Sequence, residues 1–233
     1  MLLVDIGNSR VKAAWVHPNA TLQRVTLRRP ADLHQWAGKP IAYIDVRRAE
    51  PWRRVLGELQ ATELTPSLGL PFPSAYSQTL GADRAAQILA VWQAGKYPAL
   101  ILSLGTACVL DYIDETGRHQ GGIITAGAHL RLRSLGTFTG LLPTLTPSKA
   151  PLAFPGRTTE EALQIGVVQG LALELQGWLR HLASPQTSPT LWVTGGEAPL
   201  LLPFLPADAI FVPDLTLRGM WLWWHALQKG SSA

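Results

Sequence analysis

Short apolar runs separated by polar turn residues occupy the first part of the chain. Apolar stretches at 2–6 and 11–16 flank the tetrapeptide GNSR at 7–10, and turn residues between two such stretches predict a β-hairpin. Weaker strand patterns follow at 22–27 and at 41–46, where the sequence reads IAYIDV. The chain is therefore expected to begin as a sheet built around a hairpin.

Helical spacing of apolar residues marks three later regions. Residues 50–60 and 160–182 have apolar positions on one face, as an amphipathic helix requires. A third helix is predicted to begin near Asp83 and to end at Gly95, since glycine is a typical helix C-cap. A proline-rich loop at 65–81 precedes this third helix, and loops of that length are often functional.

The hairpin pattern returns in a second copy. The stretch ILSLGTACVLDYI at 101–113 has the same order as LVDIGNSRVKAAWV at 3–16, namely an apolar strand, a glycine-containing bend and a second strand. A further apolar strand within 190–201 ends in a Gly-Gly turn and runs into a short helix. Such duplication predicts two similar lobes facing each other across a nucleotide. The expected fold class is α/β, a two-lobed actin-like ATPase (ribonuclease H-like) fold with duplicated mixed sheets and flanking helices.

Composition narrows the class of protein. Hydrophobic residues make up 47% of the 233 residues and charged residues 15%, which is enough apolar surface for a packed core. The net charge of +4 is spread thinly without a basic stripe, so we expect no nucleic-acid partner. No apolar run approaches the roughly twenty residues of a membrane-spanning helix, and no signal-peptide pattern is present, so we expect a cytoplasmic protein without a membrane partner.

Cysteine and histidine give no sign of a metal cluster. The single cysteine, Cys108, lies in an apolar run and is expected to be an inert core residue, because one thiol forms neither an intramolecular disulfide nor a cysteine cluster. The six histidines lack the spacing of metal ligands, so we interpret them as surface or core residues.

The first hairpin carries more than its turn requires. Gly7, Asn8 and Ser9 suit a simple turn, and a plain hairpin remains one interpretation. That interpretation does not explain Asp5 at the end of a strand or Lys12 shortly after the bend. Free N–H groups, a lysine and a carboxylate together are suited to a polyphosphate and its Mg²⁺.

Two further positions combine helix starts with possible chemistry. Asp83 begins a helix, where the helix dipole favours its ionised form, and it is either a helix cap or a carboxylate poised for proton acceptance; both roles are compatible. Thr158 and Glu161 have the spacing of a capping box, which leaves the hydroxyl of Thr159 at a helix start where a polar ligand can meet it.

Several motifs together resemble the type III pantothenate kinases. The resemblance extends over nearly the whole chain, and the GADR segment at 81–84 is its most specific part. The matching motifs, in chain order, are DIGNSRVK, GADR, LGTACVLD, GGIITAG, GRTTEEALQIG, TGGEAPLL and PDLTLRGM. The resemblance implies a transferase that phosphorylates pantothenate with ATP to 4'-phosphopantothenate, the first step of coenzyme A biosynthesis, and that forms a homodimer.

The resemblance also implies roles for individual residues. For ATP and Mg²⁺ it implies Asp5, Ile6, Gly7, Asn8, Ser9, Arg10, Val11, Lys12, Gly105, Thr106, Gly195 and Gly196, with Asp5 helping to place the metal. For pantothenate it implies Tyr76, Gly81, Ala82, Asp83, Arg84 and Thr159, with Asp83 as the catalytic base. A loop tyrosine that only packs remains an alternative for Tyr76, and a surface ion pair remains one for Arg84. The expected lobes are 1–97, with the first phosphate loop and the GADR segment, and 98–233, with the second phosphate loop and the adenosine motif.

Two positions depart from the family pattern. Ser103 stands where the family carries an aspartate that binds a monovalent cation, K⁺ or NH₄⁺, and a neutral hydroxyl is a weaker ligand for such an ion. Dependence on that cation is therefore in doubt, although Asp111 remains at the end of the same hairpin. Ala126 replaces a proline of the family motif. Two other functions stay open: a regulatory protein, and a degenerate homologue that binds nucleotide with little turnover.

Overall fold

The computed structural model describes residues 1–149, 153–182 and 188–230, which fall into two compact units. The first unit contains Met1–Gly95, the short segment Gly117–Gln120 and the chain from Asp214 onward; the second contains Lys96–Thr116 and Gly121–Pro213. The expected division at residues 97 and 98 assigned the C-terminal segment to the second lobe. In the structure that segment belongs to the first unit, because its helix packs against other elements of the first unit.

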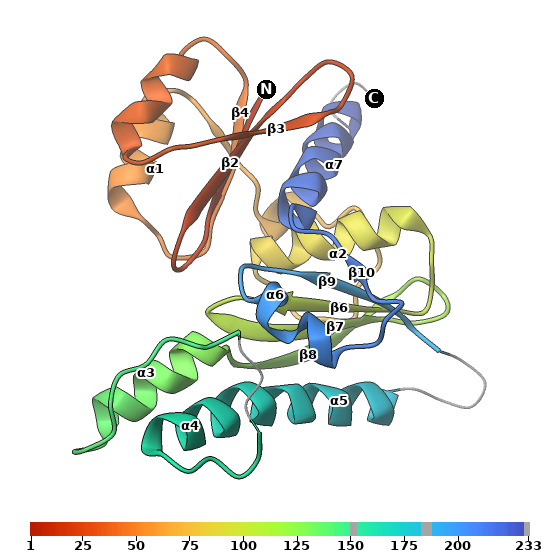
Figure 1. Ribbon diagram of the computed structural model, residues 1–233. Coiled ribbons are helices and arrows are strands. Elements are labelled where there is room, and N and C mark those ends of the chain that lie inside the picture. Colours follow the sequence, from red (N-terminus) through yellow and green to blue (C-terminus); the bar gives the residue numbers. More distant parts are fainter. Residues whose placement is uncertain (150–152, 183–187, 231–233) are drawn as a thin grey trace. The chain divides into compact units, whose positions relative to one another are not determined.

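A mixed five-stranded sheet forms the centre of the first unit (Figure 1). Its order is β3-β2-β1-β4-β5, with β2 antiparallel to β1 and β3, and with β4 parallel to β1 and β5. The strands are β1 (Leu2–Ile6), β2 (Val11–Val16), β3 (Leu22–Val25), β4 (Ile41–Asp45) and β5 (Thr62–Glu63). The predicted hairpin is therefore confirmed at both of its strands.

Helices cover the two faces of this first sheet differently. Leu2, Val4 and Ile6 point into a core shared with α1 (Glu50–Glu58) and the 3-10 helix η1 (Pro30–Trp36). Because successive side chains of a strand point to opposite faces, Leu3 and Asp5 lie on the other face, where α2 (Ala82–Ala94) and α7 (Leu215–Gly230) pack. Asp5 is thereby directed to the side of the sheet that carries the helix beginning at the GADR segment.

Close backbone contact joins α2 to α7. A Cβ added at Gly219 would lie 1.7 Å from the carbonyl oxygen of Ala86, so only glycine permits this approach. The buried side chain of Gln87 also donates a hydrogen bond to the hydroxyl of Thr216 at 3.0 Å. As predicted, α2 ends at Gly95, which is left-handed (φ 68°). These contacts fix the axis of α2, and with it the position of its first turn.

The second unit repeats the sheet of the first. Its order β8-β7-β6-β9-β10 matches β3-β2-β1-β4-β5 strand for strand, with the hairpin pair antiparallel and the next two pairs parallel. The strands are β6 (Ala99–Leu104), β7 (Ala107–Ile113), β8 (His119–Ala126), β9 (Thr190–Thr194) and β10 (Ile210–Phe211). The predicted duplication of mixed sheets is confirmed.

Helices α3, α4 and α5 lie along one side of the second sheet (Figure 1). The helix predicted at 160–182 is present as one continuous run, formed by α4 (Thr159–Gln164), a π-helical segment (Ile165–Gln169) and α5 (Gly170–Leu182). Helix α3 (Ala128–Phe138) was not predicted, because three basic or histidine side chains interrupt its apolar positions. The remaining short helices are α6 (Ala198–Leu201), η2 (Pro66–Leu68) and η4 (Leu202–Phe204).

Two smaller points concern the core and the membrane. Cys108 is buried in the core of the second unit, and burial raises the pKa of its thiol to about 12, which keeps it unreactive as expected. In the described part of the chain, none of the helices is both long and apolar enough to cross a membrane.

Candidate active site

The first hairpin places a carboxylate opposite a lysine. In the register of β1 and β2, Asp5 pairs directly with Lys12, so both side chains point to the same face of the sheet. The bend between them, residues 7–10, is closed by the N–H of Gly7, which donates to the carbonyl of Arg10 at 3.1 Å. Asn8, Ser9 and Arg10 are exposed at the tip. The loop therefore presents polar groups beside an acid and base pair.

Asp5 is unusually buried for a carboxylate. Its exposed fraction is 6%, and burial raises the pKa of its side chain to about 6. The positive charge of Lys12 opposes this shift, whereas the negative charge of Asp83 adds to it. A buried carboxylate with a raised pKa is typical of functional sites, where a positively charged ligand favours the ionised form.

The start of α2 brings Asp83 to the same region as Asp5. Gly81 is the N-cap residue, and Asp83 lies in the first turn, where its Oδ1 accepts a hydrogen bond from the N–H of Arg84 at 2.9 Å. A Cβ at Gly81 would lie only 2.7 Å from that Oδ1, so the glycine leaves room for the carboxylate. Asp83 thus caps a free N–H of the helix, and its charge acts on Asp5.

Arg84 is a buried cation held against an aromatic ring. Only 6% of its surface is exposed, and its guanidinium carbon lies 4.6 Å from the centre of the Tyr76 ring. A guanidinium in this position gains cation–π attraction while its N–H groups remain fixed in a planar fork. The expected alternative of a surface ion pair for Arg84 is wrong, because the side chain is buried.

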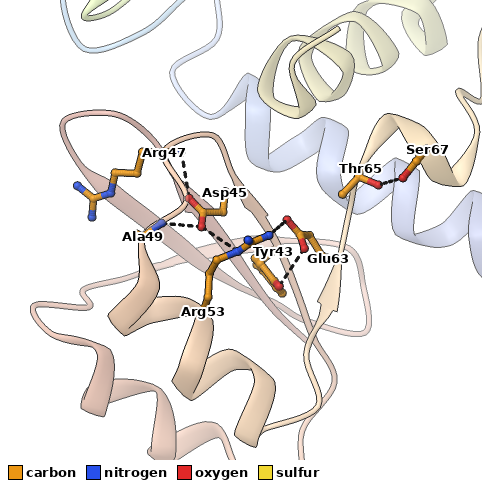
Figure 2. A network of polar contacts seen from close by, with 8 residues as sticks. All are labelled: Tyr43, Asp45, Arg47, Ala49, Arg53, Glu63, Thr65 and Ser67. Carbon is orange, nitrogen blue, oxygen red and sulfur yellow. Dashed lines mark hydrogen bonds and ion pairs between the residues drawn. The ribbon is translucent and has the colours of Figure 1, made fainter. Parts of the chain in front are cut away.

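A polar network braces the strand beside the first hairpin (Figure 2). The carboxylate of Asp45 accepts hydrogen bonds from the N–H groups of Arg47 and Ala49 at 3.1 and 2.9 Å and forms an ion pair with Arg53 at 3.3 Å. Arg53 also bonds Glu63 at 2.6 Å, and the hydroxyl of Tyr43 donates to Glu63. Asp45 pairs with Ile6 rather than Asp5 in the register, so it points to the opposite face and supports the strand rather than the site.

The second hairpin has a tighter and less charged bend. Residues 105–106 connect β6 to β7, and the N–H of Gly105 donates to the carbonyl of Ala107 at 3.1 Å. The carbonyl of Thr106 accepts from the N–H of Gly127 at 2.9 Å, which ties the start of α3 to the bend. The predicted residues Gly105 and Thr106 therefore lie at a point where two segments of the second unit meet.

The glycine turn after β9, at Gly195 and Gly196, lies against the end of β6. Gly195 has a φ of 103°, and a Cβ on it would lie 2.1 Å from the carbonyl oxygen of Leu104. Both observations require glycine, whereas nothing lies within 4 Å of a Cβ placed on Gly196. The strand end at Leu104, next to Gly105, and the turn after β9 are thus in backbone contact.

Glu197 is a further member of this cluster that was not predicted from the sequence. Its buried carboxylate accepts hydrogen bonds from the N–H groups of Ala128 and His129 at 2.8 and 3.3 Å and pairs with the His129 ring at 2.8 Å. It therefore neutralises the N-terminus of α3 and fixes that helix to the Gly-Gly turn. The signal available in the sequence was the acid directly after TGG, but the helix it caps was not predicted.

Ser103 shares one face of the second sheet with two other polar residues. It pairs with Thr194 on β9 and with Val109 on β7, and Asp111 lies two residues beyond Val109, on the same face as Ser103. Asp111 and Thr194 are both buried, with exposed fractions of 2%. Asp111 is thus the carboxylate of this hairpin that shares a face with Ser103.

Thr159 belongs to the second unit and has no described contact with the glycine turns or Glu197. It is the first residue of α4 and is exposed, while Thr158 caps the helix by accepting from the N–H of Glu161 at 3.2 Å, as predicted. The Glu161 carboxylate accepts from the N–H of Arg157 at 2.7 Å. A role for Thr159 in binding stays a prediction.

The Asp5 carboxylate suits a metal ion that binds together with a nucleotide. Among the described residues, no group of three or more His, Cys, Asp or Glu side chains is placed to hold a metal ion. Mg²⁺ commonly keeps water and substrate phosphate oxygens as ligands and takes only one or two carboxylates from a protein. A buried carboxylate with a raised pKa, beside a loop of exposed polar residues, fits that type of site.

Sequence comparisons point to one family. A model of the type III pantothenate kinase family matches residues 47–181. The chain is 32% identical to the type III pantothenate kinase of Alkalilimnicola ehrlichii, over 94% of this chain and 95% of that protein. It is 33% identical to the protein of the same name from Gloeobacter violaceus, over 94% and 96% of the two chains.

Solved structures agree on the fold. A Campylobacter jejuni protein described as a Baf family transcriptional activator superposes with a TM-score of 0.68 at 24% identity, covering 98% of this chain and all of that chain. A protein from Sinorhizobium meliloti described as a 2-dehydro-3-deoxygalactonokinase superposes with a TM-score of 0.61 at 13% identity, covering 97% and 96%. At these identities the likeness concerns the fold alone, and it agrees with the predicted actin-like ATPase fold.

Proposed function

The chain belongs to the type III pantothenate kinase family, and we propose that it transfers the γ-phosphoryl group of ATP to the hydroxyl of pantothenate. The product is 4'-phosphopantothenate, formed in the first step of coenzyme A biosynthesis. The observation that carries this proposal is the approach of two carboxylates, Asp5 and Asp83, beside a hairpin with an exposed polar bend.

In this proposal Asp83 is the catalytic base. The pantothenate oxygen forms a bond to the γ-phosphorus while the bond from phosphorus to the β–γ bridging oxygen breaks, so that ADP leaves. The hydroxyl proton passes to the Asp83 carboxylate. Phosphoryl transfer needs mainly orientation and late proton acceptance, so an ionised aspartate is basic enough. The hydrogen bond from the Arg84 N–H supports the role, because it fixes the direction of the carboxylate.

Arg84 and Tyr76 are proposed to hold the carboxylate end of pantothenate. A guanidinium suits a carboxylate because two parallel N–H groups meet its two oxygens. Burial of Arg84 and its contact with the Tyr76 ring support this assignment, since a fixed guanidinium loses little freedom on binding. Gly81 and Ala82 contribute backbone to the same turn, and Thr159 is proposed as a further contact.

The two hairpins are proposed to hold the phosphates of ATP. The first loop, Asp5 to Lys12, offers N–H and hydroxyl groups and the ammonium of Lys12, while Gly105 and Thr106 offer the second bend. Gly195 and Gly196 are proposed for the adenosine, because nothing lies within 4 Å of a Cβ placed on Gly196, so a ligand can approach the backbone there. Asp5 would hold Mg²⁺, which when bound neutralises charge on the phosphates.

The monovalent cation of the family is proposed to be weakly bound or absent here. Ser103 provides a neutral oxygen where a carboxylate would attract K⁺ or NH₄⁺. Asp111 is the alternative ligand, because it lies on the same face of the sheet, two residues beyond the β7 partner of Ser103.

We further propose that the chain forms a homodimer through the second unit. Large apolar side chains are strongly exposed there, including Phe138 at 85% and Leu141 at 97% of their surfaces. Phe154, Leu173 and Trp178 are exposed in the same unit. Exposed apolar residues in this number favour contact with a second copy of the chain over contact with water. Light scattering coupled to size-exclusion chromatography tests it, and a monomer at micromolar concentration contradicts it.

An ADP-release assay tests the proposed kinase activity. Wild-type protein with ATP and Mg²⁺ is measured with and without pantothenate, in K⁺, NH₄⁺ and Na⁺. Release that depends on pantothenate supports the proposal. A protein that binds ATP and releases no ADP under any of these conditions is the degenerate homologue instead.

A further inference from the structure

His119 is buried in the first unit, beside the loop that leads to the GADR segment. Its exposed fraction is 0%, and it forms a parallel β-bridge with Ser74. The His119 N–H donates to the carbonyl of Pro73 at 3.0 Å, and its carbonyl accepts from the N–H of Ala75 at 2.8 Å. The histidine is therefore fixed by its backbone against residues 73–75.

The side chain of His119 is fixed as well. Its Nδ1 lies 2.9 Å from the hydroxyl oxygen of Ser74, which also accepts the N–H of Tyr76 at 3.1 Å. The imidazole ring contacts two aromatic rings, Phe72 with centroids 6.4 Å apart and Tyr76 with centroids 5.9 Å apart. One serine hydroxyl thus connects the histidine ring with the backbone of Tyr76.

The Tyr76 ring contacts both His119 and Arg84. It is tilted by 32° against the His119 ring, and it carries the guanidinium of Arg84 at 4.6 Å from its centroid. Phenylalanine at position 119 would fill similar space, but only a hydrogen-bonding ring also engages the Ser74 hydroxyl. The arrangement links His119 to Arg84 through Tyr76.

We propose that His119 is a positioning residue, which holds Ser74 and Tyr76 so that Arg84 is oriented for the carboxylate of pantothenate. This inference rests on the proposed function, in which Arg84 binds that carboxylate. In this proposal His119 acts through Ser74 and Tyr76 rather than through contact with the substrate. Its loss should therefore weaken binding at the pantothenate end of the site and leave the nucleotide end unchanged.

Three substitutions separate the ring from the hydrogen bond. His119→Ala removes both, His119→Phe keeps a ring but loses the bond, and Ser74→Ala loses the bond and keeps the imidazole. His225→Ala is the matched control, because His225 also contacts an aromatic ring, Trp221, in the same unit, but on the exposed part of α7. The Michaelis constants for pantothenate and ATP and the kcat are measured separately for each variant.

We expect His119→Ala to raise the KM for pantothenate about three- to tenfold, the range for loss of an oriented cation–π contact. His119→Phe and Ser74→Ala should have smaller effects of the same kind. The kcat and the KM for ATP should stay within about twofold of wild type, which a general loss of folding would not produce. An unchanged KM for pantothenate in His119→Ala, or an equal rise in both Michaelis constants, overturns the inference.

A second readout does not depend on turnover. In NMR spectra the side-chain protons of Arg84 should be shifted upfield by the Tyr76 ring, and loss of the shifted signals in Arg84→Lys assigns them. His119→Ala should move these signals toward the values of exposed arginines, while His225→Ala should not. If wild-type protein fails to phosphorylate pantothenate, the proposed function fails, and the Arg84 signals alone decide on His119: an unmoved signal refutes the positioning role.

Discussion

The two hairpins share one topology and differ in charge. Asp5 on β1 pairs with Lys12 on β2, whereas Ser103 occupies the corresponding place on β6 and pairs with Val109 on β7. The first hairpin therefore contains an acid and a base where the second has a hydroxyl and an apolar side chain. The bend of the first spans residues 7–10 and is exposed, and that of the second spans only residues 105–106.

This difference indicates that the two duplicated units have different roles. The first unit contains both the buried carboxylate that suits a metal and Asp83, whereas the second contains two converging glycine turns, at Gly105 and Gly195. Charge close to a phosphoryl group changes the chemistry, while glycine turns bring backbone N–H groups close to a ligand. We infer that the first unit supplies most of the catalysis and that the second mainly binds the nucleotide.

Among the variants that test this comparison, Asp83→Asn should lower the catalytic rate the most. If the base lies in the first unit, kcat should fall about 10²–10⁴-fold, the usual loss for a positioned base. ATP binding and the melting temperature should change little, because asparagine can still accept from the Arg84 N–H. Steady-state kinetics with calorimetric ATP titration measure both. Asp208→Asn, at an exposed position, is the control, and a rate for Asp83→Asn equal to that control leaves Asp83 with a capping role only.

Asp5→Asn should stabilise the protein while it removes activity. The pKa of Asp5 is about 6 in the folded chain against an ordinary value of 3.8, so the folded state binds its proton more tightly than the unfolded state does. Between these two values the wild type loses stability as pH rises, because the buried carboxylate becomes charged. The free energy of unfolding of Asp5→Asn, minus that of wild type, should rise from pH 4 to pH 7 by about 3 kcal/mol at most.

Urea unfolding of both proteins across that pH range provides the measurement. Ser103→Ala is the comparison variant, because the equivalent position of the second hairpin is already neutral. Its stability difference from wild type should not depend on pH over this range. A difference for Asp5→Asn that is flat with pH contradicts the assignment of the buried charge.

Lys12→Ala and Thr106→Ala compare the two bends directly. A bond from a charged donor is worth more than one from a hydroxyl, so Lys12→Ala should raise the KM for ATP by roughly tenfold or more and Thr106→Ala by only a few-fold. The KM for pantothenate should stay close to wild type in both. If only the pantothenate value moves, the loops have been assigned to the wrong ligand.

The smallest expected effect concerns the monovalent cation. Wild-type activity should be similar in K⁺ and Na⁺, since a missing anionic ligand should weaken cation binding by about tenfold or more. Ser103→Asp should create or strengthen stimulation by K⁺. Strong activation of the wild type by low millimolar K⁺ contradicts this, and if Asp111→Asn then abolishes the activation, Asp111 is the substituting ligand.

The sequence was informative wherever local pattern determines structure. Strands 2–6 and 11–16, the Gly95 cap and the Thr158 cap follow from alternation and from the preferences of single residues, and the structure confirms them. The duplicated sheets followed from repeated order rather than from any one motif. These features depend on residues that are close together in the chain.

Contacts between segments that are far apart in the sequence were not predicted. Placing the C-terminal helix on the first unit depends on Gly219 meeting Ala86, more than a hundred residues away, and no local pattern indicates that partner. Glu197 likewise caps a helix near residue 128, and His119 reaches Tyr76 only after the chain returns to the first unit. Such residues look like ordinary surface or core positions until the fold is known.

Transfer of labelled phosphate from ATP to pantothenate tests the central claim most directly. Wild-type protein is incubated with γ-labelled ATP, Mg²⁺ and pantothenate, and the products are separated and identified by mass. The account predicts one 4'-phosphopantothenate for each ADP released, with transfer reduced about 10²–10⁴-fold in Asp83→Asn. Label that stays on ATP, or that appears as free phosphate at the same rate without pantothenate, would contradict it.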